Sequence, residues 1–266
     1  MVSFIGKLVS SVLCSLSLVA LLFSAQSAAQ APAPSIAAAA NIKFAMEQIV
    51  KNYRQDTGNN VRVSYGSSGN FVTQLSHGAP FELFLSADEK YVKTLADNGF
   101  TRDSGAVYAY GKLALVVPKS SALKVDAELA DLKQQLANKQ IKRFAIANPE
   151  HAPYGERARE LLQHQGLWSA LQGKLVYGEN VSQAAQFALS GSTDGGIVAL
   201  SLAVAPQFKA RGRYIAIPQQ HYSPLAQRMV LMKNASPAAQ AFYQYLQSAA
   251  ARKVFSDFGF ALPETP

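Results

Sequence analysis

The chain has 266 residues, of which 49% are hydrophobic and 16% charged, enough apolar residues for one large domain or two modest domains. Its formal net charge is +8. The lysines and arginines are nevertheless scattered, with no basic run and no interleaved aromatic residues, which argues against a nucleic-acid partner. The single cysteine is Cys14, in the N-terminal segment, so a mature chain without that segment has no disulfide and no thiol chemistry.

Residues 1–29 have the pattern of a secretory signal peptide. Lys7 supplies a positive charge, an apolar run covers Leu8–Phe23, and Ser27-Ala28-Ala29 offers small residues as at a signal cleavage site. The apolar run is too short and too rich in serine for a membrane span. We therefore expect cleavage near Ala29, no lipid anchor on Cys14, and a periplasmic mature protein.

A strand, a tight turn and a helix follow one another twice at the start of the mature chain. Ser35–Ala39 is predicted to be a buried strand, and Asn41 to be the N-cap of an amphipathic helix. Val61–Tyr65 alternates like a half-buried strand, and Gly66–Gly69 links it to a helix that begins near Phe71. Two such units side by side direct two helix N-termini toward one edge of a parallel sheet.

The second turn has the composition of an anion site. The first N–H groups of a helix are unpaired, and the helix dipole favours negative charge there. Gly66 and Gly69 allow close backbone approach, while Ser67 and Ser68 add hydroxyl donors. The turn therefore predicts an anion held by dipoles. A capped turn with two solvated serines is the simpler interpretation, and it remains open.

The remaining apolar runs predict an α/β fold. Further strands are expected at Phe81–Ser86, Tyr108–Val117, Phe144–Ala147, Leu175–Tyr177, Gly195–Leu200, Tyr214–Ile217 and Met229–Met232. Further helices are expected at residues 88–98 and 156–165, after Asn180, and after Ser236-Pro237. We expect the chain to cross into a second lobe after Tyr108–Val117 and to return near Met229–Met232. Residues 35–117 plus 226–266 then form lobe 1, and residues 118–225 form lobe 2.

Together these segments resemble the periplasmic molybdate-binding proteins, which are the solute-binding components of molybdate ABC transporters. The resemblance covers nearly all of the mature chain, and Gly78–Asp88 is its most specific segment. The other matching segments are Ala38–Asn41, Gly66–Gly69, Asn148–Gly155, Glu179–Val181 and Gly196–Val198. The resemblance implies a two-lobed periplasmic-binding-protein architecture. Each lobe is then a mostly parallel sheet flanked by helices, and the chain crosses between the lobes twice.

The family binds a tetrahedral oxyanion between its lobes with backbone N–H groups and hydroxyls. By position, the implied ligand-binding residues are Asn41, Ser67, Tyr154 and Val181, with Ala40 and Ser68 as secondary contacts. Many relatives have Ser or Thr at the position of Asn41, and many have a ligand tyrosine at the position of Ala199. A subgroup instead has a tyrosine in its Pro-Tyr-Gly segment. We therefore expect Tyr154 to supply the phenol.

The resemblance implies high-affinity binding of molybdate, and also of tungstate, followed by delivery to an inner-membrane ABC transporter permease. The implied protein is a monomer with no cofactor, no bound metal cation, no nucleic-acid partner and no catalytic residue. None of the four ligand-binding positions is Lys or Arg, but several aligned neutral donors can hold a dianion. A receptor for sulfate, phosphate or another tetrahedral oxyanion is an alternative that residue spacing does not exclude.

A serine hydrolase is the alternative from another functional class. Ser67 or Ser68 would be the nucleophile and His151 the base, but Gly66–Gly69 lacks the Gly-x-Ser-x-Gly spacing of a nucleophile elbow. The four histidines show no metal-ligand pairing. We interpret His151, which lies between two loop prolines, as a surface or hinge residue.

Overall fold

The structure, a computed structural model, describes residues 32–264. The expected signal peptide, with Cys14 and the cleavage site near Ala29, lies outside the described residues. Within residues 32–264, every helix is too short or too polar to cross a membrane.

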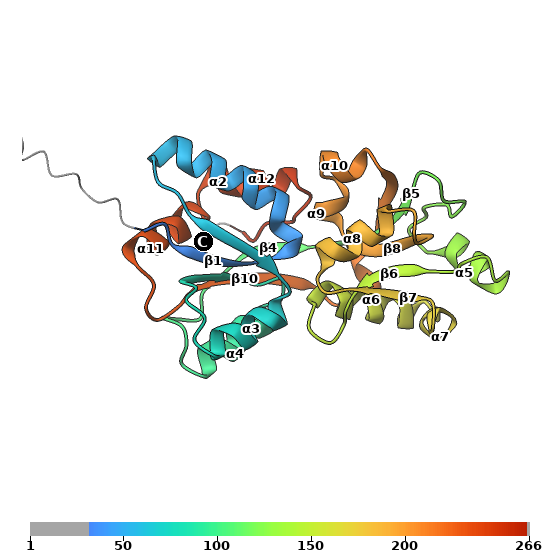
Figure 1. The fold of residues 1–266 in the computed structure, drawn as a ribbon, viewed down its shortest axis with the longest axis horizontal. Coiled ribbons are helices and arrows are strands. Elements are labelled where there is room, and N and C mark those ends of the chain that lie inside the picture. The colour runs from blue at the N-terminus through green and yellow to red at the C-terminus, as the bar shows by residue number, and fades with distance from the viewer. Residues whose placement is uncertain (1–31, 265–266) are drawn as a thin grey trace, which may run out of the picture. The chain divides into compact units, whose positions relative to one another are not determined.

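Two five-stranded sheets organise residues 33–266, the compact unit that holds the fold (Figure 1). The first sheet has the order β2 (Arg62–Gly66), β1 (Ser35–Ala39), β3 (Leu83–Leu85), β10 (Leu225–Leu231) and β4 (Ala106–Gly111). The second has the order β7 (Leu175–Gly178), β6 (Phe144–Ala147), β8 (Gly195–Ala199), β5 (Leu113–Pro118) and β9 (Gly212–Ala216). In each sheet four of the five strands run the same way, and only β10 or β5 runs opposite. The mostly parallel sheets expected from the sequence are therefore confirmed.

Helices cover both faces of the first sheet because its strands are apolar on both faces. Ile36 and Ala38 of β1 pack in one core with the helices α2 (Lys43–Thr57), α11 (Pro237–Tyr245) and α12 (Ala249–Asp257). Ala37, between them, faces the other core with α3 (Ser68–Ser76) and α4 (Glu89–Asp97). Alternate residues of a strand point to opposite faces, so a continuous apolar run is what a sheet buried on both faces requires.

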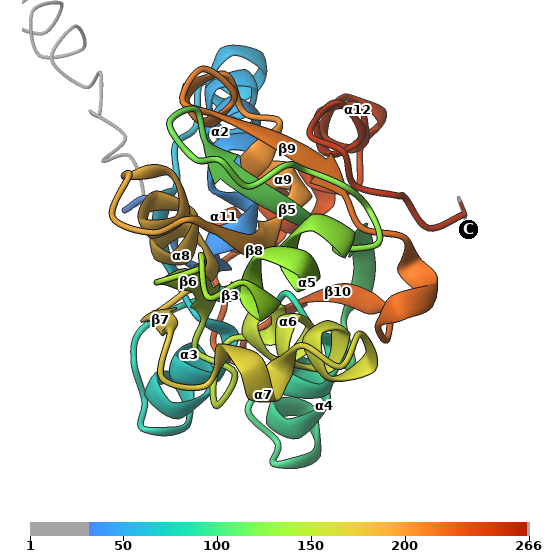
Figure 2. The same ribbon diagram turned by 90° about the vertical axis from the view of Figure 1, so that its right-hand side faces the viewer.

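The second sheet is covered in the same way. In Figures 1 and 2 it lies between α8 (Val181–Leu189) and α9 (Leu200–Ala203) on one side and α6 (Pro153–His164) and α7 (Trp168–Leu171) on the other. The shorter elements α5 (Ala130–Ala137), α10 (Pro206–Lys209) and the 3-10 turn η2 (Gln219–His221) complete this part of the fold. One continuous apolar core joins the sheet to these helices.

One expected strand is wrong. The apolar run Tyr108–Val117 is not a single strand, because β4 ends at Gly111 in the first sheet and β5 begins at Leu113 in the second. The error arose because both strands are apolar and buried, so hydrophobicity gave no sign of the break. The expected return strand, Met229–Met232, lies within and just beyond β10, entirely in the first sheet. We propose that the chain crosses between the lobes at Lys112 and again between β9 and β10.

Candidate functional site

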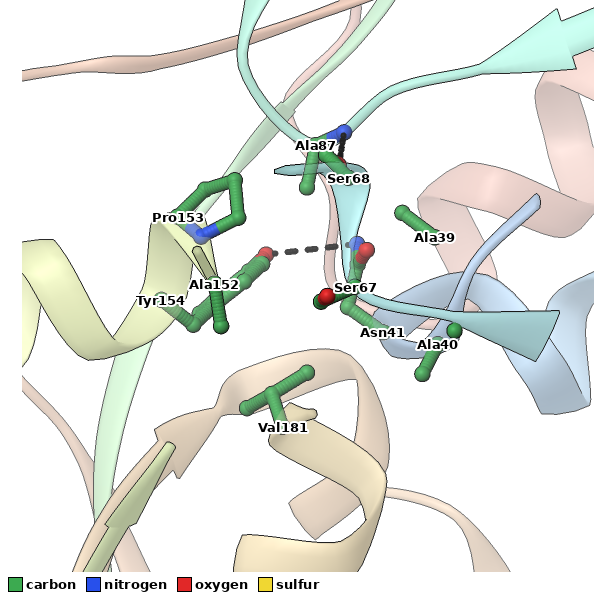
Figure 3. Close-up of a pocket in the computed structure, with 11 residues that line it drawn as sticks. Ala39, Ala40, Asn41, Ser67, Ser68, Ala87, Ala152, Pro153, Tyr154 and Val181 are labelled. Atoms are coloured by element: carbon green, nitrogen blue, oxygen red, sulfur yellow. Dashed lines mark hydrogen bonds between the residues drawn. The ribbon is translucent and has the colours of Figure 1, made fainter. Parts of the chain in front are cut away.

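A small cavity lies where the two sheets face each other. It has a volume of about 190 Å³. Its lining residues are Ala39, Ala40, Asn41, Gly66, Ser67, Ser68, Ala87, Ala152, Pro153, Tyr154 and Val181 (Figure 3). The structure thus brings all six residues expected at the site into one cavity, and none of the lining side chains is charged. Their role as ligand contacts remains a prediction.

Helix starts supply most of the cavity wall. Ser67 is the N-cap of α3, Asn180 is the N-cap of α8, and Pro153 begins α6. Val181 and Ser68 are first residues of their helices, so their N–H groups have no acceptor within the helix. These unpaired groups and the helix dipoles favour a negative charge in the cavity.

The expected N-cap role of Asn41 is wrong. Asn41 lies inside a 3-10 turn, η1 (Ala40–Ile42), that precedes α2, and its side chain caps no helix. Instead its Nδ2 donates to Gln227 Oε1 at 2.9 Å and to the Tyr154 hydroxyl at 3.4 Å. The Asn41 amide, which the sequence pattern predicted to cap a helix, therefore bonds to Gln227 and Tyr154, which are distant in sequence.

The oxygen of the same amide has no hydrogen-bond partner among residues 32–264. Asn41 is only 1% exposed, and this oxygen, Oδ1, is buried. A buried polar atom without a partner is costly, roughly 1–3 kcal/mol, and commonly marks the place of a water molecule or ligand.

Tyr154 lies in the first turn of α6, whereas the sequence pattern placed it in a loop before a helix starting near Glu156. Its hydroxyl accepts from Gln227 Nε2 at 3.0 Å as well as from Asn41 Nδ2 (Figure 3). Burial raises the pKa of this hydroxyl well above its ordinary value. The phenol therefore remains protonated at neutral pH and can act as a donor.

The two serines of the turn make different contacts. Ser67 Oγ accepts from Asn70 N at 3.4 Å and lies 3.0 Å from His151 Nδ1. Ser68 Oγ accepts from Ala87 N at 3.0 Å, which ties the start of α3 to the end of β3. Both serines are buried, so the interpretation of this turn as two solvated serines is wrong.

His151 is more than the surface residue expected from its loop. Its carbonyl accepts from Gly69 N at 3.0 Å, and its Nε2 lies 3.5 Å from Glu179 Oε1. Asn70 Nδ2 donates to the same Glu179 oxygen at 2.6 Å. The start of α3 and the loops of the second sheet are therefore joined directly beside the cavity.

Further contacts connect the two sheets on the α4 side. Arg157 Nη2 of α6 lies 3.0 Å from Asp88 Oδ2, the N-cap of α4, and both side chains are largely buried. Lys90 Nζ lies 2.6 Å from Glu156 Oε2 in a more exposed pair. These ion pairs lie outside the cavity, so they hold the walls together without contributing charge to the lining.

Sequence reasoning missed Gln227, which does not line the cavity but contacts both Asn41 and Tyr154. Gln227 is completely buried in β10. The sequence did contain a signal for Gln227. Leu225, Gln227 and Met229 are alternate residues and so lie on one face of a strand, and Gln227 is the amide between two apolar residues on that face. A polar side chain in such a position needs buried partners, and here the partners are site residues.

Comparison with known proteins agrees with this geometry. A family model for bacterial extracellular solute-binding proteins matches residues 34–261. The chain is 37% identical over 238 residues to the molybdate-binding protein ModA of Azotobacter vinelandii, covering 88% of this chain and 92% of the relative. It is 36% identical to the molybdate-binding protein ModA of Rhodobacter capsulatus, covering 84% of this chain and 86% of the relative.

The fold agrees as well. The structure is similar to the solved periplasmic molybdate-binding protein of Azotobacter vinelandii, with a TM-score of 0.79 and 31% identity, over 87% of this chain and 100% of that chain. These findings confirm the resemblance inferred from the sequence segments and the two-lobed α/β architecture. The chain belongs to the bacterial extracellular solute-binding protein family.

Proposed function

We propose that this protein binds molybdate in the periplasm and delivers it to an inner-membrane ABC transporter permease. The observation that carries the proposal is the small cavity between the two sheets, lined by all six expected residues and by no charged side chain. Relatives at 36% and 37% identity that bear the name molybdate-binding protein support the choice of anion.

The oxyanion is held by neutral donors. The Tyr154 hydroxyl and the hydroxyl of Ser67 donate from opposite walls, and the backbone N–H groups of Asn41 and Val181 donate at helix starts. Ala40 and Ser68 add backbone N–H groups beside them. Hydrogen bonds to an ionised acceptor are stronger than neutral ones, so several such donors replace a full positive charge.

The ligand is selected by size. A cavity whose walls are tied together by hydrogen bonds and ion pairs cannot shrink onto a smaller anion without losing contacts, so sulfate binds more weakly than molybdate. Neutral hydrogen-bond donors distinguish between anions only by the shape and the charge of the anion. Tungstate, nearly identical to molybdate in both, therefore binds as well.

Export and assembly follow from the same proposal. Residues 1–29 act as a cleavable signal peptide, and the mature protein works as a monomer in the periplasm. The intact mass of the secreted protein tests this, since a chain that retains Cys14 or carries a lipid contradicts it.

Calorimetry tests the ligand. We expect one site per chain for molybdate and for tungstate, with sulfate and phosphate far weaker, because the cavity has a fixed size and only neutral donors. The matched control is Ser67→Ala, which removes one hydroxyl from the wall and weakens binding of both metal oxyanions. Equal affinity for sulfate or phosphate favours the alternative, a receptor for a smaller tetrahedral oxyanion.

We propose binding without turnover. Ser67 Oγ lies 3.0 Å from His151 Nδ1, and His151 Nε2 lies 3.5 Å from Glu179 Oε1. This order of a serine, a base and an acid favours a hydrolase as the second candidate. However, the Glu179 side chain is 61% exposed and the cavity has little free space. Turnover of generic ester substrates by the wild type, abolished in Ser67→Ala, would support the hydrolase.

A further inference from the structure

Gln227 occupies a special position in the first sheet. It is completely buried in β10 opposite Ala109 of β4. The register of the two strands shifts between Gln227 and Arg228, which leaves Tyr108 of β4 without a partner residue. A bulge of this kind redirects side chains, and here Tyr108 and Gln227 contact each other.

The Gln227 amide makes hydrogen bonds to three side chains. Its Oε1 accepts from Asn41 Nδ2 at 2.9 Å and from the Tyr108 hydroxyl at 3.0 Å. Its Nε2 donates to the Tyr154 hydroxyl at 3.0 Å. Asn41 Nδ2 donates to Oε1, and the Tyr108 hydroxyl shares its one hydrogen between Oε1 and Ser86 O. Because Oε1 faces these donors, the amide is held with Nε2 directed at Tyr154.

The donors around Tyr154 determine where its own hydrogen points. A phenol has one hydrogen and lone pairs on a single oxygen. Those lone pairs accept from Gln227 Nε2 and Asn41 Nδ2. The hydroxyl hydrogen is therefore left for a third partner, and Tyr154 lines the cavity.

Gly111 keeps this arrangement compact. A Cβ atom at Gly111 would overlap both the Tyr154 hydroxyl and Gln227 Nε2. The absence of a side chain there lets the hydroxyl and the amide meet between two lobes. The Tyr154 hydroxyl is therefore enclosed by Gly111, Gln227 and Asn41, and its remaining open direction is the cavity.

We propose that Gln227 is a positioning residue for ligand binding, which holds the Tyr154 hydroxyl so that its hydrogen points into the cavity. Gln227 touches no ligand itself. It converts a hydroxyl that could donate or accept into an obligate donor, which suits a ligand whose oxygens are acceptors. The inference rests on the proposed anion-binding function, and it adds a residue outside the cavity lining to the determinants of that function.

The first test needs no ligand. In protein labelled with ¹³C at the tyrosine ζ carbon, Gln227→Met removes one donor to the Tyr154 oxygen while keeping a side chain of similar length. We expect the Tyr154 resonance to move and the Tyr222 resonance to stay. Tyr222 is the matched control because its buried hydroxyl accepts from Leu113 N and donates to Ile217 O, so it makes no hydrogen bond to Gln227. An unmoved Tyr154 resonance overturns the proposal.

The second test is a double-mutant cycle with molybdate as the probe. We expect Gln227→Met to weaken binding roughly tenfold, as loss of a well-placed hydrogen bond to a charged ligand does. In the Tyr154→Phe background the same change should have almost no effect, because Gln227 acts through the hydroxyl. Equal effects in both backgrounds would show a merely structural role and overturn the proposal.

The direction of the change is also informative. If the hydrogen bond ran the other way, from Tyr154 to Gln227, then Gln227→Met would free the hydroxyl and tighten binding, which contradicts the proposal. If Gln227→Met does not fold, Gln227→Asn, whose amide is one methylene short of Tyr154, replaces it. If the wild type binds no molybdate, the proposed function fails, while the ligand-free resonance still decides the role of Gln227.

Discussion

Three buried tyrosines show how the partners of a hydroxyl decide its use. The one hydroxyl hydrogen of Tyr108 is shared between Ser86 O and Gln227 Oε1, and Tyr222 accepts from Leu113 N and donates to Ile217 O. Burial raises the pKa of all three hydroxyls, so all are donors at neutral pH. Only the Tyr154 hydroxyl accepts from two amides and lines the cavity, which leaves its hydrogen for a ligand.

At the residue scale, Tyr154→Phe should lower molybdate affinity and also destabilise the fold, because Gln227 Nε2 and Asn41 Nδ2 lose a buried acceptor. A hydrogen bond to a charged group is worth about 1.5–3 kcal/mol, so affinity should fall roughly tenfold to a hundredfold. Calorimetry measures the affinity and thermal unfolding the stability. Tyr222→Phe, the control, should lower the melting temperature without changing affinity.

A comparison with Ser67→Ala shows whether the Tyr154 hydroxyl contacts the ligand or Tyr154 only packs beside the site. Ser67→Ala should weaken binding whether or not Tyr154 contacts the ligand, because Ser67 lies on the opposite wall. A Tyr154→Phe variant with wild-type affinity, beside a weakened Ser67→Ala variant, would remove Tyr154 from the site and leave the anion site intact.

At the element scale, the sequence predicted most strands and the helix starts at residue 88, Asn180 and Ser236, because local signals decide them. Asn180 and Ser236 cap their helices as expected, each side chain accepting from N–H groups of the first turn. Ser67 also caps its helix, which starts at Ser68 and not near Phe71. Asn41 has the same chemistry but does not cap, because Gln227 and Tyr154 compete for its amide. A cap can be predicted from nearby residues, whereas a partner distant in sequence cannot.

The same distinction separates the predicted part of the site from the missed part. Six lining residues were implied by short segments that resemble the family, but Gln227 lies 73 residues from Tyr154 and 186 from Asn41 in sequence. Pairing across such separations depends on how the sheets are assembled. The start of α6 is a different case, because Pro153 at the first helical position was a local signal that the prediction of a loop overlooked.

Gly69 in the first turn of α3 tests how closely the lobes approach. A Cβ atom there would lie 2.7 Å from the His151 carbonyl oxygen, so Gly69→Ala should oppose the contact beside the cavity. The same change favours the helix itself, by roughly 0.5–1 kcal/mol. We therefore expect weaker molybdate binding by calorimetry, with a melting temperature of the ligand-free protein that is unchanged or higher.

Gly78→Ala is the control with the opposite expectation. Gly78 has a φ of +83° and open space around it, so alanine strains the backbone by about 1 kcal/mol without touching the second lobe. Its melting temperature should fall and its affinity should stay. Unchanged affinity in Gly69→Ala would mean that the ligand binds without this contact.

At the scale of the whole molecule, four groups of contacts join the lobes. In one of them, Ser201 Oγ of α9 donates to Asn41 O at 2.8 Å, and the ring of Phe208 in α10 packs edge-on against that of Phe44 in α2. The Tyr154 hydroxyl accepts from Asn41 and Gln227, the start of α3 meets His151 and Glu179, and α4 pairs with α6. A ligand that touches both lobes adds to these contacts only when the lobes are together. It therefore stabilises the closed form by its differential affinity for that form.

We expect small-angle X-ray scattering to show a smaller radius of gyration when molybdate is added to the ligand-free protein. Gly69→Ala, in which closure is opposed, should show a smaller decrease at the same molybdate concentration. A radius that does not change in the wild type would mean that the lobes are already together without ligand, or that the site lies within one lobe.

The position of Gly111 next to the proposed crossing at Lys112 has a mechanical consequence. When two lobes rotate about a hinge, the residues near the hinge move least, and Gly111 adjoins both the Tyr154 hydroxyl and the Gln227 amide. If the chain bends at Lys112, the part of the site around the Tyr154 hydroxyl stays nearly assembled while the rest of the two lobes moves apart. An anion would then contact the oriented Tyr154 hydroxyl before the lobes close. Closure would bring Ser67 and Val181 into contact with an anion that is already bound.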